Sequence, residues 1–290
     1  MLAPRADFQV EAISLRKGLP FRQARIVGTM LLALTALPVA GVAQSDVLVR
    51  AHAHNDYLHS RPLLDALDHG FNSVEVDVHL VDGELFVAHD RNSIMPGRTL
   101  ETLYLQPLRT IVRRHDGRVH AGAPPLLLLI DVKSDSAATY ERLGTVLRDY
   151  ADILTIVAGE AVLPGAVTAV ISGERARSAM LETPIRFAAY DGRLADLEGP
   201  TAKLPGSFMP LVSQNWSAIS GWNGIGPEPP ELRATLTKWA DSAHAQGRRL
   251  RLWGTPEEPG VWKALLESGV DLINTDDLLG LRSFLKGSTP

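Results

Sequence analysis

Four short segments in the first half of the chain carry the residue types that chemistry needs. They are Ala51-His52-Ala53-His54-Asn55-Asp56-Tyr57, Glu75-Val76-Asp77, Ala88-His89-Asp90 and Asp131-Val132-Lys133. Six of the nine histidines of the chain fall between positions 52 and 89. Imidazole groups suit proton transfer or metal binding, and carboxylates suit hard cations. These segments are therefore the candidates for a functional site.

The spacing within the segments places their polar side chains on common faces. Residues two apart on a strand point to the same side, which pairs Glu75 with Asp77 and His52 with His54. Two carboxylates at such a short distance repel each other unless a cation lies between them. With a third oxygen donor, such a pair suits Mg²⁺ or Ca²⁺. Asp131 and Lys133 similarly bring an acid and a base to one face.

Each segment also has a purely structural interpretation. A single acid at a strand end is more often a helix cap or a surface ion-pair partner. Asp131 and Lys133 could form a structural ion pair, and the histidines outside positions 52, 54 and 89 have no evident partner. The functional interpretation is favoured because two histidines, three acids and one lysine close consecutive strands.

Short β-rich runs alternate with segments of helical periodicity from residue 47 onward, which predicts βα units and a parallel sheet. The expected strands are 47–53, 73–78, 85–89, 126–132, 167–171, 185–189, 209–213, 249–253 and 271–275. The expected helices are 62–69, 100–115, 137–150, 174–180, 231–246, 261–268 and 278–285. The turn at Asp82-Gly83 makes strand 85–89 a hairpin extension, which leaves eight strands. Eight strands favour a TIM (β/α)8 barrel, with a doubly wound sheet as the alternative. Catalytic residues of such a barrel lie at the C-terminal ends of its strands.

Composition excludes several classes of function. The chain has 29 Lys+Arg and 33 Asp+Glu, a formal net charge of −4, so no nucleic acid is expected as a partner. The absence of cysteine excludes disulfides, thiolate metal sites and cysteine nucleophiles.

The first 43 residues have the pattern of an export signal. A basic leader precedes residues 26–43, which carry no charge and end in small residues around Ala43. We predict a signal peptide at 1–43, a single barrel domain at 44–290, and a periplasmic or secreted protein without stable membrane insertion after cleavage. A membrane anchor at 26–43 is the alternative. The sequence does not indicate an oligomeric state.

The order of these motifs resembles the phospholipase C-like phosphodiesterase superfamily, which includes glycerophosphodiester phosphodiesterases, phosphatidylinositol-specific phospholipases C and sphingomyelinases D. The resemblance spans residues 47 to about 281. His54-Asn55-Asp56-Tyr57, Glu75-x-Asp77, His89-Asp90 and Asp131-x-Lys133 match its motifs, as do Leu252-Trp253-Gly254 and the ending Gly269-Val270-Asp271-Leu272-Ile273-Asn274-Thr275-Asp276. The branch named for altered inheritance of mitochondria, with its His-Asn-Asp-Tyr, is the best match.

The resemblance implies a metal-dependent phosphoric diester hydrolase acting on a small-molecule or lipid phosphodiester. Metal binding is assigned to Glu75, Asp77 and Asp131, with one Mg²⁺ or Ca²⁺ as the cofactor. His54 and His89 become general acid and base, in an order that remains open. Asn55, Lys133 and Trp253 become the phosphate or substrate contacts, although Trp253 could equally be a core aromatic.

The sequence also departs from the superfamily. The His-Arg-Gly of the glycerophosphodiesterases is missing, so no arginine stands at position 55, and the 42 residues from His89 to Asp131 leave little room for their inserted subdomain. Three alternatives stay open at this point: a lyase that forms a cyclic phosphate, a zinc hydrolase of the amidohydrolase type using His52 and His54, and a non-catalytic phosphate-binding barrel.

Overall fold

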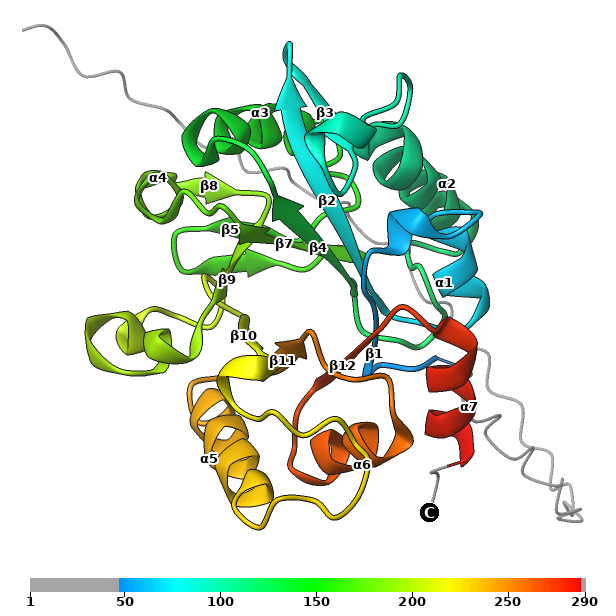
Figure 1. Cartoon of the computed structure of the whole chain (residues 1–290). Helices are drawn as coiled ribbons and strands as arrows, with labels where there is room; N and C mark the ends of the chain where they lie inside the picture. Colours follow the sequence, from blue (N-terminus) through cyan, green and yellow to red (C-terminus); the bar gives the residue numbers. More distant parts are fainter. Residues whose placement is uncertain (1–46, 288–290) are drawn as a thin grey trace, which may run out of the picture. The chain divides into compact units, whose positions relative to one another are not determined.

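The apolar runs of the sequence form the strands of a closed parallel barrel. The computed structural model describes residues 47–287, and its main sheet runs in the order β1-β12-β11-β10-β9-β7-β4-β2, with β1 returning to β2 (Figure 1). The barrel strands are β1 (Ala51–Ala53), β2 (Ser73–Val81), β4 (Leu126–Val132), β7 (Val167–Gly173), β9 (Ala189–Gly192), β10 (Leu211–Asn215), β11 (Arg249–Trp253) and β12 (Leu272–Thr275). The predicted TIM-type barrel is confirmed.

The strength of the strand pairing varies around the barrel. Strands β4 and β7 pair in register from Leu126 with Val167 to Val132 with Gly173. By contrast, β1 pairs with β2 through Ala53 and Val74 alone. The barrel is therefore closed at β1 by its shortest stretch of ladder.

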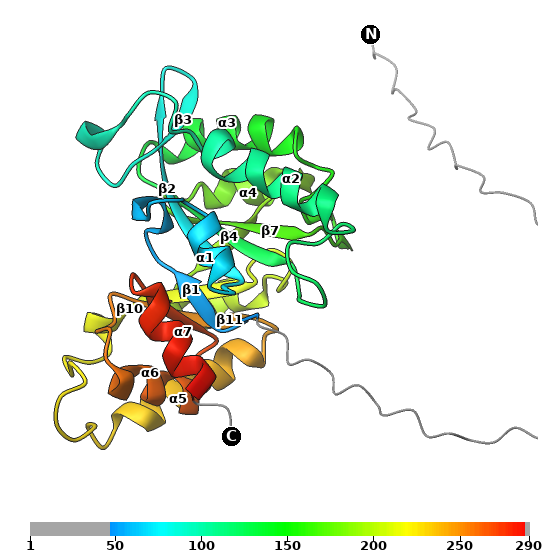
Figure 2. The ribbon, with the colours of Figure 1, turned by 90° about the vertical axis from the view of Figure 1, so that its right-hand side faces the viewer.

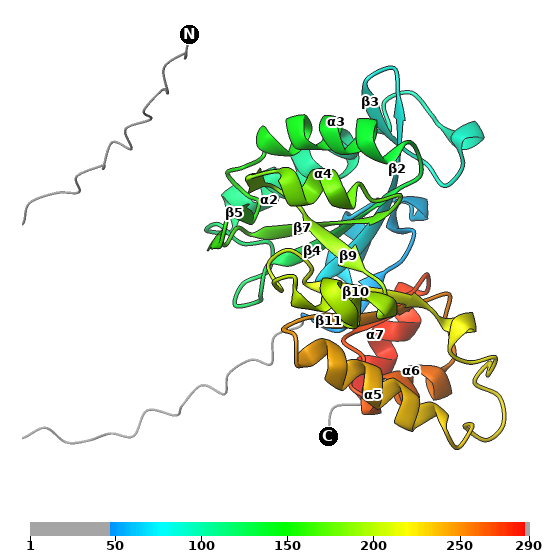
Figure 3. The same cartoon turned by 90° about the vertical axis from the view of Figure 1, so that its left-hand side faces the viewer.

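Helices cover the outside of the barrel. They are α1 (Leu64–Asp68), α2 (Gln106–Arg114), α3 (Ser136–Arg148), α4 (Arg177–Glu182), α5 (Leu232–His244), α6 (Pro259–Glu267) and α7 (Leu278–Gly287). Helices α3 and α4 lie along one side, with α5 and α6 at the other end of the view (Figure 3). The last helix, α7, lies beside α1 (Figure 2), and Arg282 Nη1 donates to Asp68 O across the two, 3.1 Å apart. The first and last βα units thus meet at the closure.

Strand β3 (Glu84–Val87) extends β2 as an antiparallel hairpin, as predicted. Asp82 and Gly83 have φ values of 50° and 81°, the left-handed pair that a tight two-residue hairpin turn requires. The hairpin carries the chain from the end of β2 back towards His89.

Three details differ from the sequence prediction. The predicted strand at 185–189 is wrong: Ile185–Arg186 (β8) pairs with β5 (Ile156–Ala158) in a separate small sheet with β6 (Ala161–Leu163), and the barrel strand β9 starts at Ala189. Two 3-10 helices, Leu194–Leu197 and Gly199–Lys203, follow β9 in a segment for which no helix was predicted. The predicted helix 100–115 opens with a π-helical turn, Glu101–Leu105.

The predicted signal peptide or anchor at 1–43 lies outside the described residues. Within residues 47–287, no helix combines the length and the apolar character needed to span a bilayer.

The interior of the barrel is apolar towards one end and polar towards the other. The apolar interior is a separate buried cluster that includes Leu127, Leu129, Val170, Leu211 and Leu272. Near the C-terminal strand ends, the buried interior side chains are polar instead: His52, Glu75, Asp77, Ser172, Asp191, Ser213, Arg251 and Asn274. Burial of polar groups costs free energy unless they are paired. This polar layer is therefore where function is expected.

Below β1, the buried Asp56 supports a strained turn. Its Oδ2 accepts hydrogen bonds from Leu63 N and from Tyr104 Oη, and Leu63 has a left-handed φ of 65°. Its Oδ1 is buried without a partner. Burial outweighs these hydrogen bonds and raises the pKa of Asp56 from 3.8 to about 6.

We expect this shift to make stability depend on pH. Because the folded-state pKa of Asp56 is raised, the folded protein binds the proton more tightly than the unfolded chain between about pH 4 and 6. The contribution of Asp56 to the free energy of unfolding is therefore present below pH 4 and falls by roughly 3 kcal/mol as the pH rises through 6. Denaturant unfolding should show that the free energy of unfolding of wild type falls relative to that of Asp56→Asn as the pH rises through this range. A pH-independent difference would contradict the assignment.

Candidate active site

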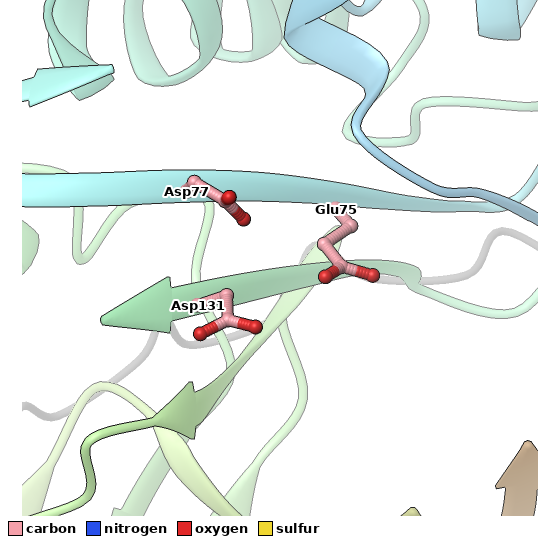
Figure 4. Close-up of side chains that lie close together, drawn as sticks. All are labelled: Glu75, Asp77 and Asp131. Atoms are coloured by element: carbon pink, nitrogen blue, oxygen red, sulfur yellow. The ribbon is translucent and has the colours of Figure 1, made fainter. Parts of the chain in front are cut away.

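Three carboxylates meet in the polar layer at the C-terminal end of the barrel. Glu75 and Asp77 project from β2 and Asp131 from β4, and one carboxylate oxygen of each lies within 4.8 Å of those of the others (Figure 4). Asp77 and Asp131 are register partners on the paired strands, which fixes their proximity. The two-residue spacing and the adjacent strand thus build the cluster that the sequence predicted.

Glu75 is fixed in place by a network of buried hydrogen bonds. Its Oε2 lies 3.0 Å from His52 Nε2 and accepts a hydrogen bond from Arg251 Nη2, whose Nε donates to Asn274 Oδ1 at 2.9 Å. Burial would raise the pKa of Glu75, but the Arg251 charge and the His52 hydrogen bond outweigh it and lower the pKa. Glu75 is therefore a fixed, ionised carboxylate at neutral pH.

Asp77 and Asp131 each keep one oxygen without a partner. Asp77 Oδ1 and Asp131 Oδ1 are buried and accept no hydrogen bond. Burial and the neighbouring carboxylates raise the pKa of both, that of Asp131 to about 6, although Lys133 Nζ lies 3.3 Å from Asp77 Oδ2 and 3.4 Å from Asp131 Oδ2. Two unpartnered carboxylate oxygens in a crowded acidic cluster are what a cation would occupy.

His54 follows β1 and lines the same cavity as Lys133. Its Nδ1 lies 2.8 Å from Asp276 Oδ1 and 3.1 Å from Asn55 Nδ2. Burial lowers the pKa of His54, but the hydrogen bond to Asp276 and the charges of Glu75 and Asp276 outweigh it and leave the pKa raised. An imidazole oriented by a carboxylate through one nitrogen presents the other for proton transfer.

Asn55 and Tyr57 link His54 to the acids. Asn55 adopts a left-handed backbone, with φ of 45°, which asparagine tolerates better than most residues. Its Oδ1 lies 2.9 Å from Tyr57 Oη, and the same hydroxyl lies 2.8 Å from Asp77 Oδ2, so its one proton can go to either oxygen. The His-Asn-Asp-Tyr segment therefore connects β1 to the carboxylate cluster through its side chains.

His89 stands at the end of the β3 hairpin, beside Asp77. Its Nδ1 lies 3.2 Å from both Asp77 Oδ2 and Tyr57 Oη, and its side chain is 57% exposed. The hairpin thus delivers a second histidine to the cluster from a different strand than His54.

These groups open into one cavity of about 610 Å³. It is lined by His54, Asn55, Glu75, His89, Asp131, Val132, Lys133, Ser172, Gly173, Glu174, Arg193, Arg251, Trp253 and Gly254. Trp253 is 36% exposed at the end of β11, so it lies at the cavity wall and is not a core aromatic. All the predicted site residues line this cavity except Asp77, which is buried beneath it.

Sequence reasoning missed several residues of the site. Asp276 was visible as the acid after Thr275 in the terminal motif, whereas nothing in the sequence singled out Arg251 or Arg193. Tyr57 was quoted without a role. His52 and His54 share a face as expected, but both ring nitrogens of His52 are taken, Nδ1 lying 2.7 Å from Ser73 Oγ and Nε2 lying beside Glu75. Among residues 47–287 the potential metal-binding cluster contains acids alone, which removes the support for a zinc site at His52 and His54.

Comparison with known proteins places this site in a family. Residues 42–191, just over half of the chain and all three clustered acids, match the model of the AIM6-like phosphodiesterase domain. The chain belongs to the AIM6-like phosphodiesterase domain family. This result confirms the branch that the His-Asn-Asp-Tyr segment indicated.

Relatives of this family extend over most of the chain. The altered inheritance of mitochondria protein 6 homolog of Arthroderma benhamiae is 27% identical over 84% of this chain and 86% of its own length. Altered inheritance of mitochondria protein 6 of Eremothecium gossypii is 28% identical over 82% of this chain and 70% of its own length.

Among solved structures, a phosphoinositol-specific phospholipase C from Pseudomonas sp., described as calcium-dependent, superposes with a TM-score of 0.55. The match covers 80% of this chain and 90% of the phospholipase at 13% identity, so it shows a shared fold.

Proposed function

We propose that this AIM6-like protein is a metal-dependent phosphodiesterase that hydrolyses a phospholipid-derived phosphodiester. The observation that carries the proposal is the placement of the acid cluster, with its two unpartnered buried oxygens, between His54 and His89 in one cavity. A barrel that only needed internal stability would gain nothing from three crowded acids, two of which keep a buried oxygen without a partner. An enzyme would use the three acids to bind a cation and the two histidines to transfer protons.

The residues present fit a hard divalent cation. Glu75, Asp77 and Asp131 offer oxygen ligands alone, the donor set of Mg²⁺ and Ca²⁺. The calcium dependence stated for the Pseudomonas phospholipase makes Ca²⁺ the first ion to test, with Mg²⁺ second. When bound, the cation would supply Lewis-acid stabilisation of the negative charge on the phosphate.

The protein side chains divide the remaining work. Lys133, with its pKa kept above the ordinary value by Asp131 and Asp77 against the effect of burial, stays positive and stabilises the phosphate oxygens. His54 and His89 come from different strands and exchange protons with the entering and leaving oxygens as general acid and base. Asn55 contributes a neutral donor beside His54, and Trp253 forms a wall for the leaving alcohol.

We further propose that residues 1–43 direct the chain to the periplasm or the exterior, where phospholipid-derived diesters are the substrates. A membrane anchor at residues 26–43 would place the same barrel at a membrane surface. Fractionation of cells expressing the full chain, with mass measurement of its N-terminus, distinguishes the two arrangements.

The test of the proposed activity is product analysis by phosphorus NMR. Full-length protein would be incubated with glycerophosphodiesters, lysophospholipids and phosphatidylinositol, with Ca²⁺, Mg²⁺ or chelator. We expect a phosphomonoester signal that depends on one of the ions. A cyclic phosphate signal would instead identify a lyase, and no product from folded protein with either ion would refute the proposal.

A glycine beside the cluster provides a more local test. Gly173 has φ of 66°, and a β-carbon built on it would overlap Asp131 Oδ1 and also the backbone O and N of Val132. We expect Gly173→Ala to displace Asp131 and weaken cation binding by about 10–100-fold, measured by titration calorimetry.

Backbone strain must be separated from this displacement. Gly122 has a similar φ of 73° but no atom within 4 Å of a built β-carbon. Gly122→Ala should therefore carry only the backbone strain of a left-handed residue, about 1 kcal/mol, with unchanged cation affinity. Equal cation affinities in the two variants would show that Asp131 does not hold the ion.

A further inference from the structure

The wall of the cavity beyond the acid cluster carries a guanidinium that the proposed reaction does not use. Arg193 follows β9 and lines the cavity, with its side chain 29% exposed. Its Nη1 donates to Asp191 Oδ2 at 2.8 Å and to Gly192 O at 2.8 Å. Within residues 47–287, its Nε and Nη2 have no protein acceptor, which leaves one edge of the guanidinium for a ligand.

A buried carboxylate fixes this arginine in place. Asp191 is fully buried and accepts hydrogen bonds from Ser172 Oγ at 2.7 Å and Ser213 Oγ at 2.8 Å as well as from Arg193. The two serines come from the strands on either side of β9. Arg193 is therefore preorganised by three strands, unlike a surface arginine that must lose rotamer freedom on binding.

The charges around Arg193 favour an anion. Arg175 donates through Nη1 to Asp191 O and through Nε to Gly173 O, which holds a second guanidinium near Arg193 but outside the cavity lining. Arg177 is paired with Asp196 outside the cavity lining. Among the lining residues, Glu174 is the acid on this side, and it is exposed to solvent that screens its charge.

The spacing between the acid cluster and Arg193 is about the size of a single substrate headgroup. Asp131 is the register partner of Ser172, and β7 pairs in turn with β9. Strand β9, which Arg193 follows, is therefore two interstrand spacings, roughly 10 Å, from β4, which carries Asp131. A substrate whose phosphodiester lies at the cluster would place its headgroup alcohol against Arg193.

We propose that Arg193 is a specificity-determining residue that selects phosphodiesters whose headgroup alcohol carries a further anionic group, such as a phosphomonoester. This inference rests on the proposed function, because it takes the acid cluster as the site of the phosphodiester. Guanidinium recognises phosphate through paired N–H groups, which the free Nε and Nη2 edge supplies.

The experiment measures the binding of two probes that differ by one phosphate, inositol 1-phosphate and inositol 1,4-bisphosphate, to the full-length protein by calorimetry with excess Ca²⁺. We expect the bisphosphate to bind wild type about tenfold more tightly. Arg193→Gln should reduce this ratio to about one, and Arg193→Lys should retain part of it. Arg177→Gln removes an equally paired arginine outside the cavity and should leave the ratio unchanged.

The ratio is informative even if a variant is partly unfolded, because both probes see the same folded fraction. Equal binding of the two probes to wild type, binding of neither, or an unchanged ratio in Arg193→Gln would overturn the inference. Turnover of the corresponding glycerophosphodiesters, followed by phosphorus NMR, is scored separately. Selective binding without turnover would refute the proposed function while supporting the role of Arg193.

Discussion

His54→Ala and His89→Ala are each expected to lower kcat/KM for phosphodiester cleavage by about 10²–10⁴-fold, with the fold intact. Proton transfer by a positioned side chain contributes a factor of this size. The two imidazoles approach the acid cluster from different strands, and His54 is oriented by Asp276 at 2.8 Å. The double variant should lose little more than the worse single variant, because the two residues serve one displacement.

The chain contains a matched control for His54. His244 Nε2 lies 2.8 Å from Asp271 Oδ2, a histidine–aspartate pair of the same length, but both residues line a separate cavity that contains none of the candidate site residues. We expect His244→Ala to keep wild-type kcat/KM. Steady-state kinetics on the three variants measures these effects, and circular dichroism verifies that each variant is folded. If His54→Ala kept more than a third of the activity, a loss of only about threefold against the expected 10²-fold, the assignment would be contradicted.

Asp131→Asn should abolish cation binding and lower kcat/KM by about 10³-fold or more, while leaving the metal-free protein at least as stable as wild type. Burial and the Glu75 charge raise the pKa of Asp131 to about 6. The stability that the protonated group contributes is lost as the pH rises from 3.8 through 6, so the ionised carboxylate is unfavourable at pH 7. Asparagine removes that cost of up to about 3 kcal/mol.

Thermal unfolding with and without the cation separates the two effects. Saturation of wild type at 100 times Kd should add about 2.7 kcal/mol of stability, and the variant should show no such gain. Asp196, a buried acid paired with Arg177 outside the cavity, provides the comparison, since Asp196→Asn should keep the response to the cation. A variant at position 131 that still gained stability from the ion would exclude Asp131 as a ligand.

The sequence predicted most of the barrel because its strands are apolar runs with polar ends. The end of β4, for example, is predictable because the apolar run Leu126–Ile130 is followed directly by the charged residues Asp131 and Lys133. Strand β9 was misplaced because its functional half, Tyr190-Asp191-Gly192, looks like a turn. Asp191 is buried there only because Ser172 and Ser213, from strands distant in sequence, supply its hydrogen bonds.

The same reasoning explains which parts of the site were predictable. Glu75, Asp77 and Asp131 come from local spacing and neighbouring strands, so periodicity brings them together. Arg251 reaches Glu75 across 176 positions, and Asp276 reaches His54 across 222. Contacts of that range depend on the closure of the barrel, which a single sequence does not encode in any local pattern.

The narrow pairing of β1 with β2 gives His52 an unexpected importance. Ala53 and Val74 are the one register pair between β1 and β2, with a single bridge from Leu48 to Phe71 before it. His52 adds side-chain links between the two strands through Ser73 and Glu75. Burial and the Arg251 charge lower the pKa of His52 to about 4, so it makes this connection as a neutral group. A mutational scan would therefore score position 52 as indispensable beside His54, although His52 contacts no reacting atom. A loss of activity on substitution of His52 would therefore reflect weakened closure of the barrel between β1 and β2, and not the loss of a catalytic group.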